Sequence, residues 1–117
     1  MRRLYLATVN SWNGLLAAAR SERAIREELV ILVLAVPAAF LIAATTARAV
    51  GLIVVLLLLL AVELLNTAIE KLCDRLTLER DDQIGRVKDM GSAAVGVTLV
   101  MAGLLWLFAI AERLGLV

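Results

Sequence analysis

The chain has 117 residues, of which 62% are hydrophobic and only 4% aromatic, and its formal net charge is +1. A soluble domain of this length cannot bury so large an apolar fraction, and so small a net charge offers no basic surface for nucleic acid, so an integral membrane protein is expected. The lack of histidine and the single cysteine, Cys73, exclude an intramolecular disulfide and a Cys/His metal site, which leaves carboxylates, lysines, arginines and hydroxyls for any chemistry.

The N-terminal segment, about residues 4–22, predicts a helix that lies on the membrane surface. Leu4, Trp12 and Leu15 alternate with polar and basic residues such as Arg20. A helix with one apolar and one basic face lies in the plane of the interface. The segment has neither the long apolar core nor the cleavage site of a signal peptide, so we expect it in the mature protein.

Three later segments are apolar enough to cross a bilayer core of about 30 Å, which requires roughly 20 residues of helix. We expect these spans at about residues 27–47, 49–73 and 87–112. The first contains Pro37, which a membrane helix tolerates with a kink. The chain is therefore predicted to be a single all-α membrane domain, residues 1–117, with one surface helix and three transmembrane helices.

Basic residues predict the orientation of the spans. Only Arg48 and Arg113 lie on one side, and ten lie on the other: Arg2, Arg3, Arg20, Arg23, Arg26, Lys71, Arg75, Arg80, Arg86 and Lys88. Because basic loops stay in the cytoplasm, the N-terminus and the 71–88 loop are expected there and the C-terminus outside.

A polar stripe follows the apolar part of the second span. At 100° per residue, Glu63, Asn66, Thr67, Glu70 and Asp74 fall within roughly 100° of one another on one face. Ionisable groups at membrane depth are costly unless they face a partner, a bundle interior or water. For Asp74 a solvated helix end remains an equal alternative, whereas Glu63 lies about three turns deeper and favours a functional site.

Two further groups of charged residues flank the spans. Lys88, Asp89 and Ser92 open the third span, and Glu22, Glu27 and Glu28 precede the first. Taken alone, both groups are what an ordinary membrane interface carries, so neither by itself indicates a site.

Together, these motifs resemble the prokaryotic integral-membrane diacylglycerol kinases. The resemblance is carried by "ELLNTAIE" at residues 63–70, by Asp74 with Arg75, and by "KDMGSAAV" at residues 88–95. "NSWNGL" at residues 10–15 and "REELV" at residues 26–30 occur in the order expected of that family. The resemblance covers essentially the whole chain.

Membership would imply an ATP-dependent lipid kinase that forms a homotrimer in the bacterial inner membrane, with a periplasmic C-terminus. The sequence contains no G-x-x-x-x-G-K-[ST] loop and no glycine-rich kinase signature, so ATP would have to be held by side chains at the membrane surface. Phosphoryl transfer requires mainly positioning and charge neutralisation, which Mg²⁺ and a few cations supply.

The resemblance also implies roles for individual residues. Glu63 matches the catalytic base, and Glu22 and Glu70 match the two carboxylates that bind Mg²⁺. The ATP-binding residues implied are Arg3, Asn10, Glu22, Glu70, Glu79, Arg80, Asp81, Lys88 and Asp89. The lipid-binding residues implied are Arg3, Ser11, Trp12, Glu28, Glu63, Asn66 and Ser92.

Two departures from the family's pattern concern ATP. Asn10 stands where some relatives have an aromatic residue, and the loop at residues 78–86 matches only loosely. Because one helix cannot build a pocket alone, the site is predicted to be shared between subunits, with Glu63 and Lys88 from different chains.

Alternatives remain open at this point. Undecaprenol kinases of the same family phosphorylate a polyprenol, which also presents one primary hydroxyl at the interface. A non-enzymatic ion-conducting bundle would use the polar stripe as its path, but residues 52–62 offer no polar relay across the outer half of the span. A purely structural membrane anchor would leave the polar stripe unexplained.

Overall fold

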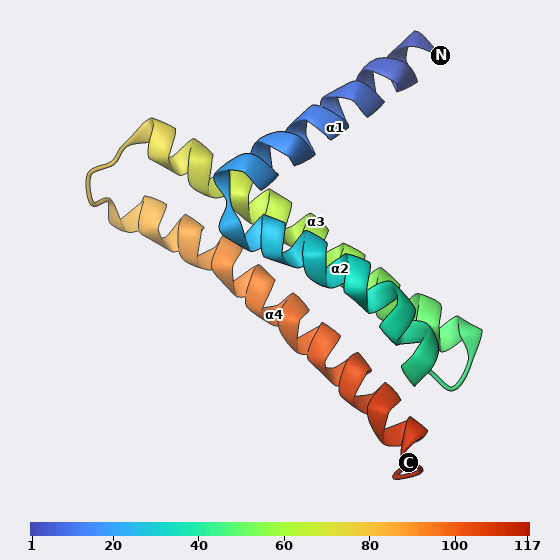
Figure 1. Ribbon diagram of the computed structural model, residues 1–117. Helices are drawn as coiled ribbons and strands as arrows, with labels where there is room; N and C mark the ends of the chain where they lie inside the picture. Colours follow the sequence, from blue (N-terminus) through green and yellow to red (C-terminus); the bar gives the residue numbers. More distant parts are fainter.

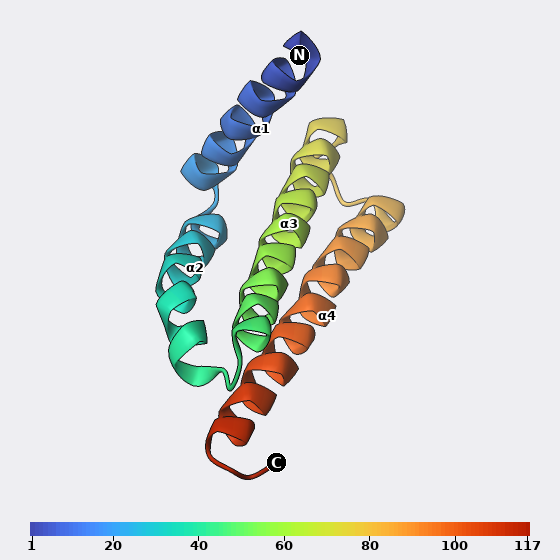
Figure 2. The same cartoon turned by 90° about the vertical axis from the view of Figure 1, so that its right-hand side faces the viewer.

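The computed structural model describes residues 1–117 and consists of four helices without any strand. They are α1 (Arg2–Ser21), α2 (Arg23–Ile42), α3 (Thr46–Leu76) and α4 (Asp82–Arg113). Helices α2, α3 and α4 run alongside one another, whereas α1 extends away from them near the end where α3 turns into α4 (Figures 1 and 2). The prediction of an all-α chain is confirmed.

The first expected span is longer than the helix that forms there. Helix α2 ends at Ile42, and the backbone of Ala43 and Thr45 is extended. The Oγ1 atom of Thr45 accepts a hydrogen bond from the backbone N–H of Arg48 at 3.2 Å and so caps α3. Residues 43–45 therefore form the turn, and residues 46 and 47, expected at the end of the first span, begin α3 instead.

Helices α3 and α4, of 31 and 32 residues, are each long and apolar enough to cross a membrane. Helix α2 does not meet the same criterion for a membrane span. Arg23, Arg26, Glu27 and Glu28 lie in its first six positions. Its apolar part, residues 29–42, is about 21 Å long at 1.5 Å per residue, which is short of a bilayer core of about 30 Å.

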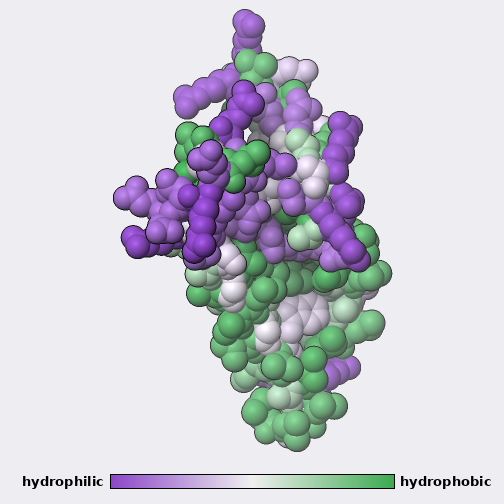
Figure 3. Space-filling view, turned by 90° about the vertical axis from the view of Figure 1, so that its left-hand side faces the viewer, coloured by the Kyte–Doolittle hydropathy of each residue, from purple (hydrophilic) through white to green (hydrophobic).

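The single chain buries little of its apolar surface. Only 15 of 117 residues are buried, and the cluster where α2, α3 and α4 meet is built mainly of small residues, namely Ala39, Ala43, Ala49 and Ala109 around Leu52. Such side chains allow helices to approach closely in a membrane. Large side chains such as Leu41 remain exposed, and Figure 3 shows apolar residues over one part of the surface and hydrophilic residues gathered at one end. This surface requires lipid or further helices to cover it.

Ion pairs join α3 to α4 near both of their ends. At the end near the C-terminus, Arg48 pairs with Glu112, and its guanidinium lies 5.5 Å from the ring centroid of Phe108. At the opposite end, Nζ of Lys88 lies 2.6 Å from Oδ1 of Asp74. The two helices are thus paired along most of their length.

The turn before α3 generates a first prediction. We expect Thr45→Ala to lower the free energy of unfolding by about 0.5–2 kcal/mol, because the first turn of α3 loses its side-chain cap. Thermal unfolding in detergent micelles measures the change. Thr45→Ser keeps the acceptor and should restore stability, and the neighbouring Thr46→Ala is the matched control. Equal stability of the two alanine variants would contradict this role for Thr45.

Candidate functional site

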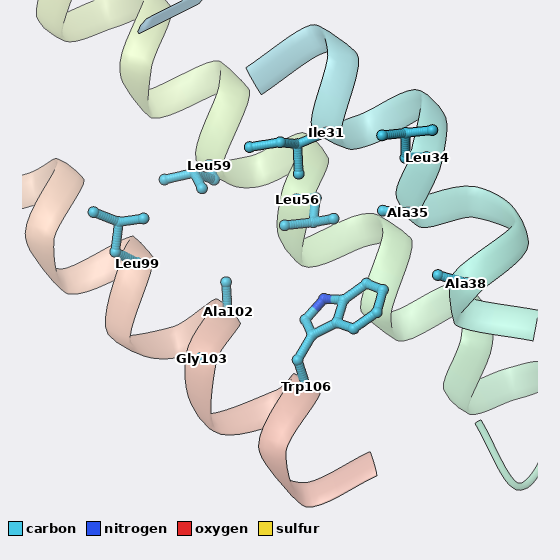
Figure 4. Close-up of a pocket in the computed structure, with 10 residues that line it drawn as sticks. All are labelled: Ile31, Leu34, Ala35, Ala38, Leu56, Leu59, Leu99, Ala102, Gly103 and Trp106. Carbon is cyan, nitrogen blue, oxygen red and sulfur yellow. The ribbon is translucent and has the colours of Figure 1, made fainter. Parts of the chain in front are cut away.

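An apolar groove runs between α2, α3 and α4. Its volume is about 540 Å³, and nine of its ten lining residues are hydrophobic. Figure 4 shows the side chains that converge on it: Ile31, Leu34, Ala35 and Ala38 from α2, Leu56 and Leu59 from α3, and Leu99, Ala102 and Trp106 from α4, beside Gly103. A groove of this composition suits hydrocarbon chains and offers almost nothing to a polar ligand.

A second cavity, which we call the carboxylate cavity, adjoins the apolar groove. It has a volume of about 240 Å³ and shares Ile31, Leu56, Leu59 and Leu99 with the groove. Glu27, Glu28 and Glu63 also line it. The apolar groove therefore borders a small space that contains two of the predicted site residues.

The two carboxylates come from helices that are distant in sequence. Glu63 lies one helical turn beyond Leu59 on α3, and Glu28 lies near the start of α2. The Oε1 atom of Glu28 is buried without a hydrogen-bond partner. Because an unpaired buried acceptor is costly, this oxygen is available to a donor such as a ligand hydroxyl.

Further along the polar stripe, Asn66 joins α3 to α4. Its Nδ2 atom donates a hydrogen bond of 3.3 Å to Oε1 of Glu70. A Cβ added to Gly91 on α4 would collide with Oδ1 of Asn66. The glycine therefore makes room for the amide, and Asn66 is packed at the interface of the two helices.

The two predicted metal ligands, Glu22 and Glu70, contact different side chains of α3, namely Lys71 and Asn66. Oε1 of Glu22, at the corner between α1 and α2, lies 3.5 Å from Nζ of Lys71, the residue that follows Glu70. No group of three or more metal-ligating side chains occurs in the structure. Two carboxylates nevertheless suit Mg²⁺, which commonly takes one or two of them together with water and substrate phosphates. Carboxylates are the donor type that this ion prefers, and Glu22 would have to exchange its contact with Lys71 for the ion.

A polar pocket of about 250 Å³, here called the loop pocket, lies where α3 turns into α4. Glu79, Arg80, Asp81 and Lys88, all predicted to bind ATP, line it together with Asp74. Oδ1 of Asp81 also caps α4 by accepting hydrogen bonds from the N–H groups of Gln83 and Ile84, at 2.9 and 3.0 Å. Asp89 does not line this pocket and faces a neighbouring one.

Other predicted residues are not brought together by the single chain. Arg3, Asn10 and Trp12 are exposed on α1 and line none of the cavities described, and Ser92 is exposed on α4. Ser11 lines a separate pocket of about 420 Å³ between α1 and α3, together with Thr67 and Lys71. These residues would contact a ligand in the groove only together with a further surface that one chain does not form.

Three residues that the structure places beside the site were not among the predicted ones. Lys71 pairs with Glu22, Asp74 pairs with Lys88, and Gly91 accommodates Asn66. Asp74 was visible on the polar stripe, but Lys71 and Gly91 carried no signal apart from their position next to Glu70 and within "KDMGSAAV".

Comparison with known proteins identifies the family. The family model described as prokaryotic diacylglycerol kinase matches residues 9–110. The chain belongs to this family. It is 42% identical over 106 residues to the diacylglycerol kinase of Pseudomonas aeruginosa, with 91% of this chain and 86% of the relative covered. It is 39% identical over 113 residues to that of Escherichia coli K12, with 97% and 93% covered, and 36% identical over 100 residues to that of Haemophilus influenzae, with 86% and 85% covered.

Family membership and the two long apolar helices together make this chain a membrane protein of the prokaryotic diacylglycerol kinase family. The resemblance of the sequence motifs is thereby confirmed.

The contact between α3 and α4 generates a second prediction. Gly91→Ala should lower the free energy of unfolding by about 1–3 kcal/mol through overpacking, because the new Cβ meets Asn66. It should also lower activity, since Asn66 must move away from Glu70. Thermal unfolding and lipid-kinase turnover measure the two effects. Gly51→Ala, which meets open space on α3, is the control; a similar stability for both variants would contradict the close approach.

Proposed function

We propose that this protein phosphorylates the primary hydroxyl of diacylglycerol with ATP and releases phosphatidic acid at the cytoplasmic face of the membrane. The observation that carries the proposal is the shared wall between the apolar groove and the carboxylate cavity that contains Glu28 and Glu63. The hydrocarbon chains of such a lipid match the apolar groove, and its single hydroxyl matches the carboxylate cavity. The relatives named diacylglycerol kinase support the same acceptor.

In the proposed complex, the acyl chains occupy the groove and the hydroxyl lies in the carboxylate cavity. Glu63 accepts the hydroxyl proton as the oxygen attacks the γ-phosphoryl group, and ADP leaves. Glu28 lines the same cavity from α2 and contacts the acceptor headgroup there. Asn66, oriented by Glu70 and by the space at Gly91, positions the base and the substrate.

ATP is proposed to bind on the cytoplasmic side of this cavity. Glu22 and Glu70 hold Mg²⁺, which neutralises charge on the phosphates when bound. Lys88 contacts the phosphates, with Asp89 beside it, and Glu79, Arg80 and Asp81 line the nucleotide's edge in the loop pocket. Arg3, Asn10, Ser11, Trp12 and Ser92 complete the nucleotide and lipid contacts from α1 and α4.

The exposure of several predicted site residues supports a site shared between subunits. Arg3, Asn10 and Trp12 on α1 and Ser92 on α4 line none of the cavities described for one chain. A homotrimer in which neighbouring chains face each other would bring further surfaces to these residues and would also cover the exposed apolar surface.

We further propose that α2 crosses the bacterial inner membrane together with α3 and α4, with the N-terminus and the 71–88 loop in the cytoplasm and the C-terminus in the periplasm. Helix α2 packs along α3. Its apolar part is short, and the charged residues of the helix all lie at the proposed cytoplasmic end. The hydrophilic residues gathered at that end of the molecule agree with this orientation (Figure 3).

The third prediction tests the proposed reaction. The purified protein should consume ATP only when both Mg²⁺ and diacylglycerol are supplied in mixed micelles. Glu63→Gln should lower turnover by about 10²–10⁴-fold, because the general base is lost while the shape of the side chain is kept. ³²P transfer to the lipid measures the product directly.

Glu112→Gln, in the ion pair with Arg48 near the other end of α3 and α4, serves as the control, because this carboxylate lines none of the cavities described and has no proposed role. Turnover with undecaprenol in place of diacylglycerol would reassign the acceptor within the family. A folded protein inactive with both lipids would refute the kinase proposal and favour a non-enzymatic helical bundle.

The fourth prediction tests the shared site. Mixed trimers of Glu63→Gln and Lys88→Ala chains, both inactive alone, should recover about a quarter of wild-type activity, because random assembly places an intact Glu63 beside an intact Lys88 at that frequency. Turnover of a refolded 1:1 mixture, compared with each variant refolded alone, measures the recovery. Mixtures that stay inactive would place both residues in the same chain.

A further inference from the structure

Asp74 and Lys88 face one another across the turn that joins α3 to α4. Oδ1 of Asp74 accepts a hydrogen bond from Nζ of Lys88 at 2.6 Å, and both side chains line the loop pocket. Arg80 and Glu79 line the same space. None of the roles proposed above uses Asp74, although its partner is the lysine assigned to the phosphates.

The geometry points to Asp74 as a positioning residue for Lys88. An ammonium group has three N–H donors, and one of them is taken by Asp74, so two remain for phosphate oxygens. Lysine is a flexible side chain that loses much rotamer freedom when it is fixed on a ligand. A lysine already held at the loop pocket has lost part of that freedom before the nucleotide arrives. This inference rests on the proposed function, since it assumes that Lys88 binds phosphate.

Two other readings of the same ion pair make different predictions. If the pair only fastens α3 to α4, its loss should lower stability and leave the binding of ATP unchanged. If Asp74 competes with phosphate for Lys88, its loss should strengthen the binding of ATP. Positioning predicts weaker binding of ATP and little change in stability, because both side chains are substantially exposed.

The test uses three substitutions of Asp74 in the full-length trimer. Asp74→Ala removes the acceptor and should raise KM for ATP by about 2- to 12-fold, the range expected when one flexible side chain must be immobilised on binding. KM for diacylglycerol should stay the same and kcat should change less. Asp74→Asn keeps an oxygen acceptor in nearly the same place and should retain most of the affinity, and Asp74→Glu should restore it in part.

The matched control is Glu112→Gln, which removes the carboxylate of the other ion pair between the same two helices, far from the loop pocket. It should leave KM for ATP unchanged. A second check is Lys88→Ala, in which Asp74→Ala should have no additional effect on the affinity for ATP because the group it positions is gone.

Direct titration with a non-hydrolysable ATP analogue and Mg²⁺ separates this inference from the proposed reaction. Weaker analogue binding by Asp74→Ala alone supports positioning, even for a protein that does not transfer phosphate to lipid. Unchanged or tighter binding by Asp74→Ala, or an equal loss in Glu112→Gln, overturns it.

Discussion

The close approach of α3 to α4 is the constraint on which the rest of this small protein depends. Ion pairs join the two helices at both ends, and Gly91 lets Asn66 fit between them. This pairing creates one wall of the apolar groove and places Asn66 and Asp74 of the polar stripe against α4 instead of lipid. Because few residues of the single chain are buried, the close packing of small residues such as Gly91 matters more here than a large core would.

Much of the fold could be predicted from the sequence because long apolar runs and charged boundaries report directly on membrane helices. The end of α2 could not. Residues 43–47 contain neither glycine nor proline, and the turn is fixed by the side chain of Thr45, which caps the next helix. A local hydrogen bond therefore sets the boundary between α2 and α3, which the hydrophobic pattern does not indicate.

The geometry of the candidate site was predictable where its residues share one helix. Glu63, Asn66 and Glu70 fall on one face by period alone, and the amide of Asn66 does bond to Glu70. The meeting of Glu28 with Glu63 depends on how α2 packs against α3, and the partners of Lys71 and Lys88 depend on the corner at Glu22 and the turn after Leu76. Contacts of this kind are tertiary, and no spacing within the chain encodes them. The roles suggested for Arg3, Asn10 and Ser92 depend further on surfaces that one chain does not contain.

The apolar groove is open along its side and lined by apolar side chains. If it holds the acyl chains as proposed, this shape constrains how an acceptor lipid arrives. Such a lipid can slide in from the surrounding leaflet without passing through water, and its phosphorylated product can leave by the same lateral route. The concentration that governs occupancy is then the mole fraction of the acceptor among the lipids, not its amount per volume of solution. An enzyme loaded in this way responds to the composition of its own membrane: diluting the acceptor with inert lipid slows it, even when the total quantity of acceptor in the sample is constant.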